Sequence, residues 1–139
     1  MSTSQLRDRI AALRAEAAAV GQQLAAKGGG MGPEELVEVT GELQGVANAV
    51  EGAQLVAIAH AGCHETRLTE RGPVQVHHEL GFVDAMTSSE VSLATGVGQW
   101  AAGRKVGLAA ALSARFPRLL ARVVAGELAT TNAAKVVTA

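Results

Sequence analysis

The chain has 139 residues, of which 48% are hydrophobic and only 2% are aromatic, and its formal net charge is −1. This length suits one domain with a single core, and a core with so few rings has to be built from Ala, Val and Leu on closely approaching helices. The composition therefore predicts an all-α fold, and the net charge by itself points to no partner.

The sequence carries no signal for export or membrane insertion. Its single cysteine, Cys63, has no partner for an internal disulfide, and residues 1–9 are polar and charged. The longest apolar stretch, residues 46–61, contains polar side chains, whereas a membrane span needs about 20 nearly uninterrupted apolar residues. We therefore expect a cytoplasmic protein that does not cross a membrane.

Residues 1–71 are expected to form the first region, a long antiparallel helical hairpin. Two apolar seams alternate spacings of three and four residues, and a Gly-rich loop near residues 28–32 separates them. The seams are Leu6, Ile10, Leu13, Ala17, Val20 and Leu24, and then Leu36, Val39, Leu43, Val46, Val50, Ala53 and Ala57. The two seams can pack against each other within one chain, or they can pack against the seams of a second chain, and the sequence leaves both alternatives open.

Residues 72–139 are expected to form a bundle of shorter helices that completes one folded unit. The first segment predicted is a surface connection over residues 67–76. Helices are then predicted over residues 78–86, from Thr87, over residues 100–114, from Pro117 to Gly126, and from a cap at Thr130 or Thr131. The last helix stops in mid-pattern at Ala139, which predicts a truncated version of something longer.

Charge is unevenly distributed along the chain. Residues 1–89 hold 6 Lys or Arg against 11 Asp or Glu, a balance of −5, and residues 90–139 hold 6 against 2, a balance of +4. A basic C-terminal third can contact nucleic acid, or it can pair with the acidic part of the same or another copy.

Residues 89–106 resemble a helix-turn-helix, with a turn at Gly96-Val97 and a second helix from near Gln99. Simple packing of the two helices is the alternative. We expect Trp100 to anchor the core rather than to stack on a base. The candidates for DNA contact are Gln99, Arg104, Lys105, Arg115, Arg118 and Arg122.

His60, Cys63 and His64 are weak candidates for a metal site. His60 and His64 are one helical turn apart, but zinc would need a further ligand. Partly exposed histidines at a helix end are the preferred interpretation, so we expect no metal and no cofactor. The sequence contains no nucleophile elbow, Walker loop or dinucleotide fingerprint, and we predict no catalytic residue.

Three motifs follow one another in the C-terminal half: Ser89 to Val97, Ala109 to Pro117, and Leu119 to Leu128. In this order they resemble the bacterial 13E12 repeat proteins, whose shared helical region is called domain of unknown function 222 and commonly precedes an HNH endonuclease module. The similarity extends from about Ala53 to the end of the chain. The His and Asn residues of an HNH module are absent, so no catalytic residue is carried over.

The resemblance implies a non-catalytic helical N-terminal domain of an HNH-endonuclease-associated protein, with a role in DNA engagement or in positioning a nuclease. DNA and a C-terminal nuclease module would be its partners. The alternative is a helical self-association or protein-interaction module without a nucleic-acid role, with a homo-oligomer formed through the seams.

Overall fold

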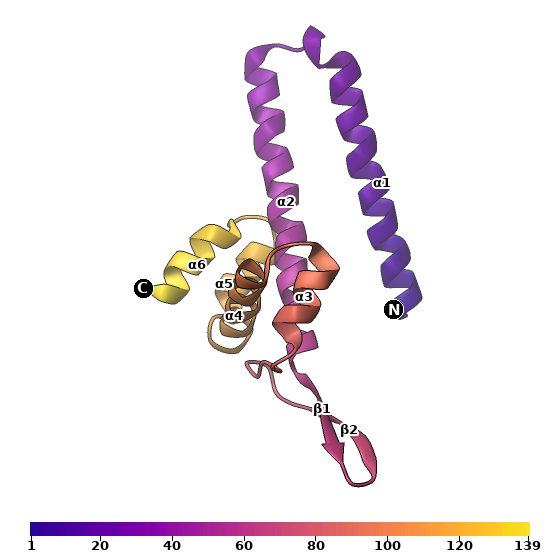
Figure 1. Cartoon of the computed structure of the whole chain (residues 1–139). Helices are drawn as coiled ribbons and strands as arrows, with labels where there is room; N and C mark the ends of the chain where they lie inside the picture. Colours follow the sequence, from indigo (N-terminus) through magenta and orange to yellow (C-terminus); the bar gives the residue numbers. More distant parts are fainter. The chain divides into compact units, whose positions relative to one another are not determined.

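The computed structural model describes residues 1–139, and the chain is mostly helical with one small sheet (Figure 1). Its elements are α1 (Thr3–Lys27), the 3-10 helix η1 (Gly28–Gly30), α2 (Pro33–Gly62), β1 (His64–Thr69), β2 (Gly72–His77), α3 (Thr87–Thr95), α4 (Gln99–Arg115), α5 (Pro117–Val124) and α6 (Thr130–Thr138). None of the helices combines the length and the apolarity that crossing a membrane requires.

The chain folds into two compact units, Met1–Glu42 and Leu43–Ala139, and α2 contributes residues to both of them. The boundary that we expected between residues 71 and 72 lies at the turn between β1 and β2, inside the second unit. The second half of α2 belongs with the shorter helices because its buried residues are part of their core.

The first unit begins with a capping box that fixes the start of α1. The Ser2 hydroxyl accepts a hydrogen bond from the Gln5 backbone N–H at 3.1 Å, and the Gln5 side chain accepts one from the Ser2 N–H at 2.9 Å. α1 then continues to Lys27, where the three glycines end it as predicted. No residue of α1 is buried.

In the second unit, α2 buries a different face from the one that its apolar seam predicted. The seam residues Val46 and Val50 are 55% and 54% exposed. The buried residues of the helix are Asn48, Gly52, Leu55, Ile58, Ala59 and Gly62. Several of these side chains are small, and they allow neighbouring backbones to come close.

The core of the second unit joins α2 to four shorter helices. At Gly52 an added Cβ would lie only 2.8 Å from the backbone N and Cα of Val124, which follows directly after the buried Val123 of α5. The buried apolar cluster consists of Leu55, Ile58, Ala59, Val91, Ala102, Val106, Ala109, Leu112, Val123 and Ala133. This composition fits a core made of small aliphatic side chains without aromatic rings.

The two strands form an antiparallel hairpin, a small sheet in a chain that is mostly helical as expected, and this hairpin stands where we expected a surface connection over residues 67–76. His64 pairs with His77 at one end of the ladder, and Thr69 pairs with Gly72 at the turn. Gly72 has a φ of 106°, a conformation that glycine adopts without steric cost. The hairpin extends away from the helices of its unit (Figure 1).

The prediction of a helix over residues 78–86 was wrong, because this segment is an irregular connection. Gly81 has a φ of 106°, which interrupts helical geometry. The segment is held by backbone bonds to the end of α2: the His78 N–H donates to the Cys63 carbonyl at 2.7 Å, and the Asp84 N–H donates to the Gly62 carbonyl at 2.9 Å.

Candidate nucleic-acid interface

A tight turn joins α3 to α4 and places the start of α4 at the protein surface. Gly96 ends α3 with a φ of 77°, and its N–H donates to the Ser92 carbonyl at 2.9 Å. The Ser92 hydroxyl also donates to the Val97 carbonyl at 2.7 Å. α4 then begins at Gln99 and buries Ala102 in the core, so the opposite side of its first turns faces solvent.

The first three DNA-contact candidates all lie in the first half of α4. The Gln99 side chain donates to the Ser89 hydroxyl at 3.3 Å across the turn. The Arg104 guanidinium lies 4.9 Å from the centroid of the Trp100 ring, and the Lys105 ammonium donates to the Gln54 side chain at 2.6 Å. Arg104 is therefore oriented by an aromatic face, and Lys105 is held against α2.

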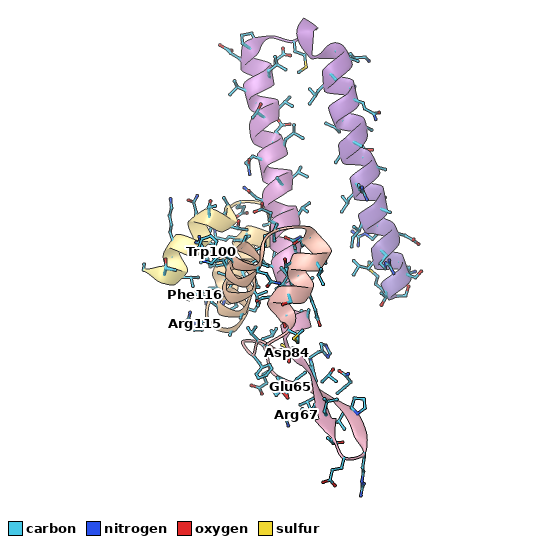
Figure 2. The ribbon with its side chains drawn as sticks, viewed as in Figure 1. Glu65, Arg67, Asp84, Trp100, Arg115 and Phe116 are labelled. Carbon is cyan, nitrogen blue, oxygen red and sulfur yellow. The ribbon has the colours of Figure 1, made fainter.

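Trp100 does not anchor the core, contrary to our expectation. Its side chain is 75% exposed and lies at the surface of α4 (Figure 2). The neighbouring Ala102 is fully buried instead, because the small side chain lets α4 approach the rest of the core closely. An exposed indole ring beside an arginine is a surface on which a planar group can stack.

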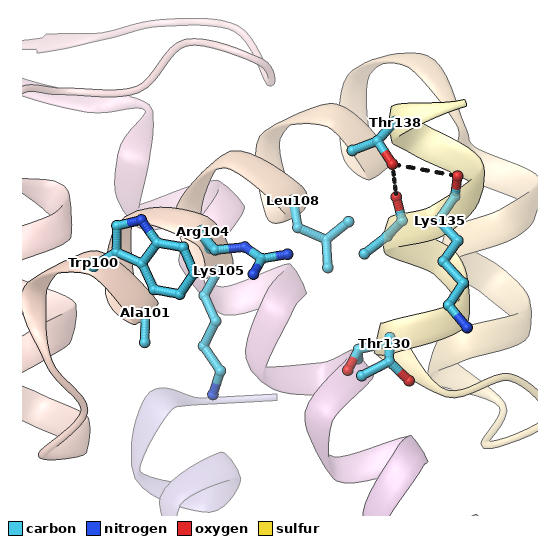
Figure 3. A pocket seen from close by; sticks show the side chains of 10 residues that line it. Trp100, Ala101, Arg104, Lys105, Leu108, Thr130, Lys135 and Thr138 are labelled. Carbon is cyan, nitrogen blue, oxygen red and sulfur yellow. Dashed lines mark hydrogen bonds between the residues drawn. The ribbon is translucent and has the colours of Figure 1, made fainter.

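α4 and α6 line a groove of about 510 Å³ (Figure 3). Its lining residues are Trp100, Ala101, Arg104, Lys105, Leu108, Thr130, Thr131, Ala134, Lys135 and Thr138. Three of them are cations and none is a carboxylate, so the lining has a positive formal charge. Lys135 was not among the contact candidates, since it follows Lys105 by 30 residues and only the fold places it in the same groove.

The three threonines of the groove differ in their hydrogen bonding. Thr130 donates to the Glu51 carboxylate at 2.7 Å, and Thr138 donates within α6 to the carbonyls of Ala134 and Lys135 at 3.0 and 3.4 Å (Figure 3). Thr131 has no side-chain hydrogen bond within the chain. Its hydroxyl can therefore donate to an acceptor such as a phosphate oxygen.

Gln99 does not line this groove, and neither do the remaining three candidates. Arg115 lies over the Phe116 ring at 5.5 Å, and it lines a second pocket of about 400 Å³ together with Arg118. Arg122 pairs with Glu127 at 3.6 Å on the surface, where both side chains are more than half exposed. The structure thus brings together Arg104 and Lys105 but separates them from the three later arginines.

The metal candidates do not form a cluster. α2 ends at Gly62, so His60 and His64 are not one helical turn apart, and His64 opens β1. The Cys63 side chain is buried and donates to the carbonyls of Ala59 and Glu79 at 3.3 and 3.4 Å. The His64 ring instead lies 4.7 Å from that of its strand partner His77. No three His, Cys, Asp or Glu side chains lie close enough together to hold one ion.

The groove therefore combines three kinds of side chain that can contact a nucleic acid. Arginine and lysine bind phosphate oxygens, a free hydroxyl adds a donor, and an exposed indole accepts a stacked ring.

Comparisons of the chain with protein-family models, with curated proteins and with solved structures found no match.

Proposed function

We propose that this chain engages DNA through the groove between α4 and α6. The observation that carries the proposal is that Arg104, Lys105 and Lys135 line one groove whose lining contains no carboxylate. Cations that neutralise phosphates and release counterions supply most of the affinity of such contacts. Trp100, at 75% exposure, adds a ring that can stack on a base.

The proposal treats α3, the turn at Gly96 and α4 as a helix-turn-helix-like element. In such elements the first residues of the second helix contact base edges. Gln99 and Trp100 occupy this position at the start of α4. The tight turn at Gly96 and the exposed first turns of α4 support this assignment.

The proposed cellular role is that of a non-catalytic N-terminal domain that engages DNA for an HNH nuclease module. It is supported by the order of the three motifs that resemble the 13E12 repeat proteins, from Ser89 to Leu128. The three helices α3, α4 and α5 end within the first, second and third of these motifs, at Thr95, Arg115 and Val124. In this role the domain binds and orients, and the chemistry belongs to the module.

An antiparallel course of α1 and α2 away from the glycine loop is part of the same proposal. It is supported within the first unit by a pocket of about 340 Å³ at the loop, whose lining includes Val20 and Leu24 from α1 and Val39 from α2. All three side chains are half-buried.

The test is a titration of labelled duplex and single-stranded DNA by fluorescence anisotropy, at several salt concentrations. Three phosphate contacts predict a slope of about −2.7 for the logarithm of the binding constant of a duplex against the logarithm of the salt concentration. The double variant Arg104→Ala/Lys135→Ala should bind more weakly and should flatten that slope by about 1.8.

The matched control is Arg71→Ala, which removes an exposed arginine from the turn of the β-hairpin. It should leave both the affinity and the slope unchanged. Absence of binding to either form of DNA at low salt would refute DNA engagement. A control variant that weakens binding as much as the groove variant would refute the assignment to this groove.

A further inference from the structure

Part of the groove between α4 and α6 is apolar. Leu108 of α4 and Ala134 of α6 are half-buried in its lining, and both belong to the second unit. Figure 3 shows Leu108 between Arg104 and α6. Apolar side chains favour contact with another apolar surface and offer no hydrogen bond to a phosphate oxygen. This part of the lining therefore suits the face of a flat ring rather than a charged backbone.

The Trp100 indole and the Arg104 guanidinium provide a planar surface beside this apolar lining. The guanidinium carbon lies 4.9 Å from the ring centroid. No other aromatic ring stacks on the indole, and Arg104 forms no salt bridge within the chain. Unpaired bases stack on aromatic rings and on guanidinium planes alike. A base therefore finds a plane to stack on at this end of the groove.

The two lysines of the groove are the partners for phosphates. Lys105 extends from α4 and Lys135 from α6, and both side chains point toward the same side of the groove in Figure 3. The Lys105 ammonium donates to the Gln54 side chain of α2 at 2.6 Å. Because this amide acceptor is neutral, it holds Lys105 in place without cancelling its charge, and the ammonium keeps further N–H groups for a phosphate.

The size of the groove suits one nucleotide. Its volume of about 510 Å³ lies within the range of about 300–1,000 Å³ that is usual for sites of small ligands. In a duplex, neighbouring bases cover both faces of each base. A side chain can therefore stack on a base only where that base is unpaired or turned out of the helix.

We propose, on the basis of the DNA contact inferred above, that the groove binds an unpaired nucleotide. The chain then binds DNA with a single-stranded segment more tightly than a fully paired duplex. The base stacks on Trp100 or Arg104 and covers the apolar lining, and its flanking phosphates bind Lys105 and Lys135. Gln99 lies outside the groove lining, so its contact with an adjoining duplex is compatible with this arrangement.

The test compares three labelled probes of equal length by fluorescence anisotropy at moderate salt: a single strand, the same strand in a duplex, and an abasic strand. The single strand should bind about tenfold more tightly than the duplex or the abasic strand, because it alone offers free base faces along its length. The abasic strand carries the same phosphates, so it separates stacking from the attraction of charges.

Two variants of Trp100 test the stacking contact. Trp100→Ala should weaken binding of the single strand about tenfold and should change binding of the duplex and of the abasic strand by less than about twofold. Trp100→Phe keeps a ring and should retain most of the affinity for the single strand. Circular dichroism checks that both variants keep their helices.

The matched control is Leu93→Ala, which removes an apolar side chain of α3 that is 86% exposed and lies outside the groove. It should leave the affinity for all three probes unchanged. A control variant that loses as much affinity for the single strand as Trp100→Ala would contradict the assignment to Trp100.

Equal affinities for the single strand and the duplex would overturn the inference and leave the DNA contact itself standing. So would an abasic strand that binds as tightly as the intact strand, or a Trp100→Ala variant that binds the single strand like the unchanged chain. Absence of binding to every probe at low salt would instead refute the proposed function, and the preference for an unpaired nucleotide with it.

Discussion

At Gly52, α2 comes so close to the end of α5 that no side chain fits between them. A Cβ at this position would lie 2.8 Å from the backbone of Val124, and backbone atoms cannot move aside as the end of a flexible side chain can. We predict that Gly52→Ala lowers the free energy of unfolding by about 1–3 kcal/mol, measured by urea denaturation.

Gly41 in the same helix is the matched control. It has no atom within 4 Å of an added Cβ, so Gly41→Ala removes only the helix penalty of glycine. This variant should be more stable than the unchanged chain by about 0.5–1 kcal/mol. If both alanine variants have the same stability, the close approach of α2 and α5 is contradicted.

At the scale of the elements, α4 carries much of the core, whereas the β-hairpin adds little apolar burial. Leu112 of α4 is fully buried, whereas Leu68 of β1 is 87% exposed. We predict that Leu112→Ala costs about 2–5 kcal/mol of stability, and that Leu68→Ser changes it by less than about 0.5 kcal/mol. Thermal unfolding followed by circular dichroism measures both, and similar losses would contradict this core.

The helices were predictable where the sequence contains strong local signals. Three glycines end α1, Pro33 and Pro117 begin α2 and α5, and the structure confirms each of these boundaries. The hairpin was missed because Val74 and Val76 alternate over a segment too short to identify without its partner strand. Its pairing depends on contacts between the two strands, which no local pattern shows.

The buried face of α2 was missed for a different reason. The periodicity of large apolar side chains predicted that Val46 and Val50 lie on the buried face, but both residues are exposed. The buried Asn48, Gly52 and Gly62 gave no such signal, since they are polar or have no side chain. Small residues fill a core by close approach of the backbones, and only the fold shows where this happens.

The candidate groove was predictable in part. Arg104 and Lys105 were named as candidates because they follow a turn at the start of a helix, the position that contacts DNA in helix-turn-helix proteins. Lys135 was missed because α6 reaches the groove only through the fold. Trp100 was placed in the core because aromatic side chains usually are, but Ala102 fills the core position instead.

For the molecule as a whole, the proposed DNA contact rests on the second unit alone, because the groove lies entirely within it. Arg7→Glu with Arg14→Glu in α1 should therefore leave the groove intact.

The fluorescence of Trp100 during a titration with DNA tests the central claim most directly, because this residue is the only tryptophan in the chain and lies in the groove. We predict a saturable change in its emission at low salt that weakens as salt is added and that needs a higher DNA concentration in Arg104→Ala/Lys135→Ala. An unchanged emission spectrum while the anisotropy of labelled DNA reports binding would contradict the account, since the DNA would then be bound elsewhere on the protein.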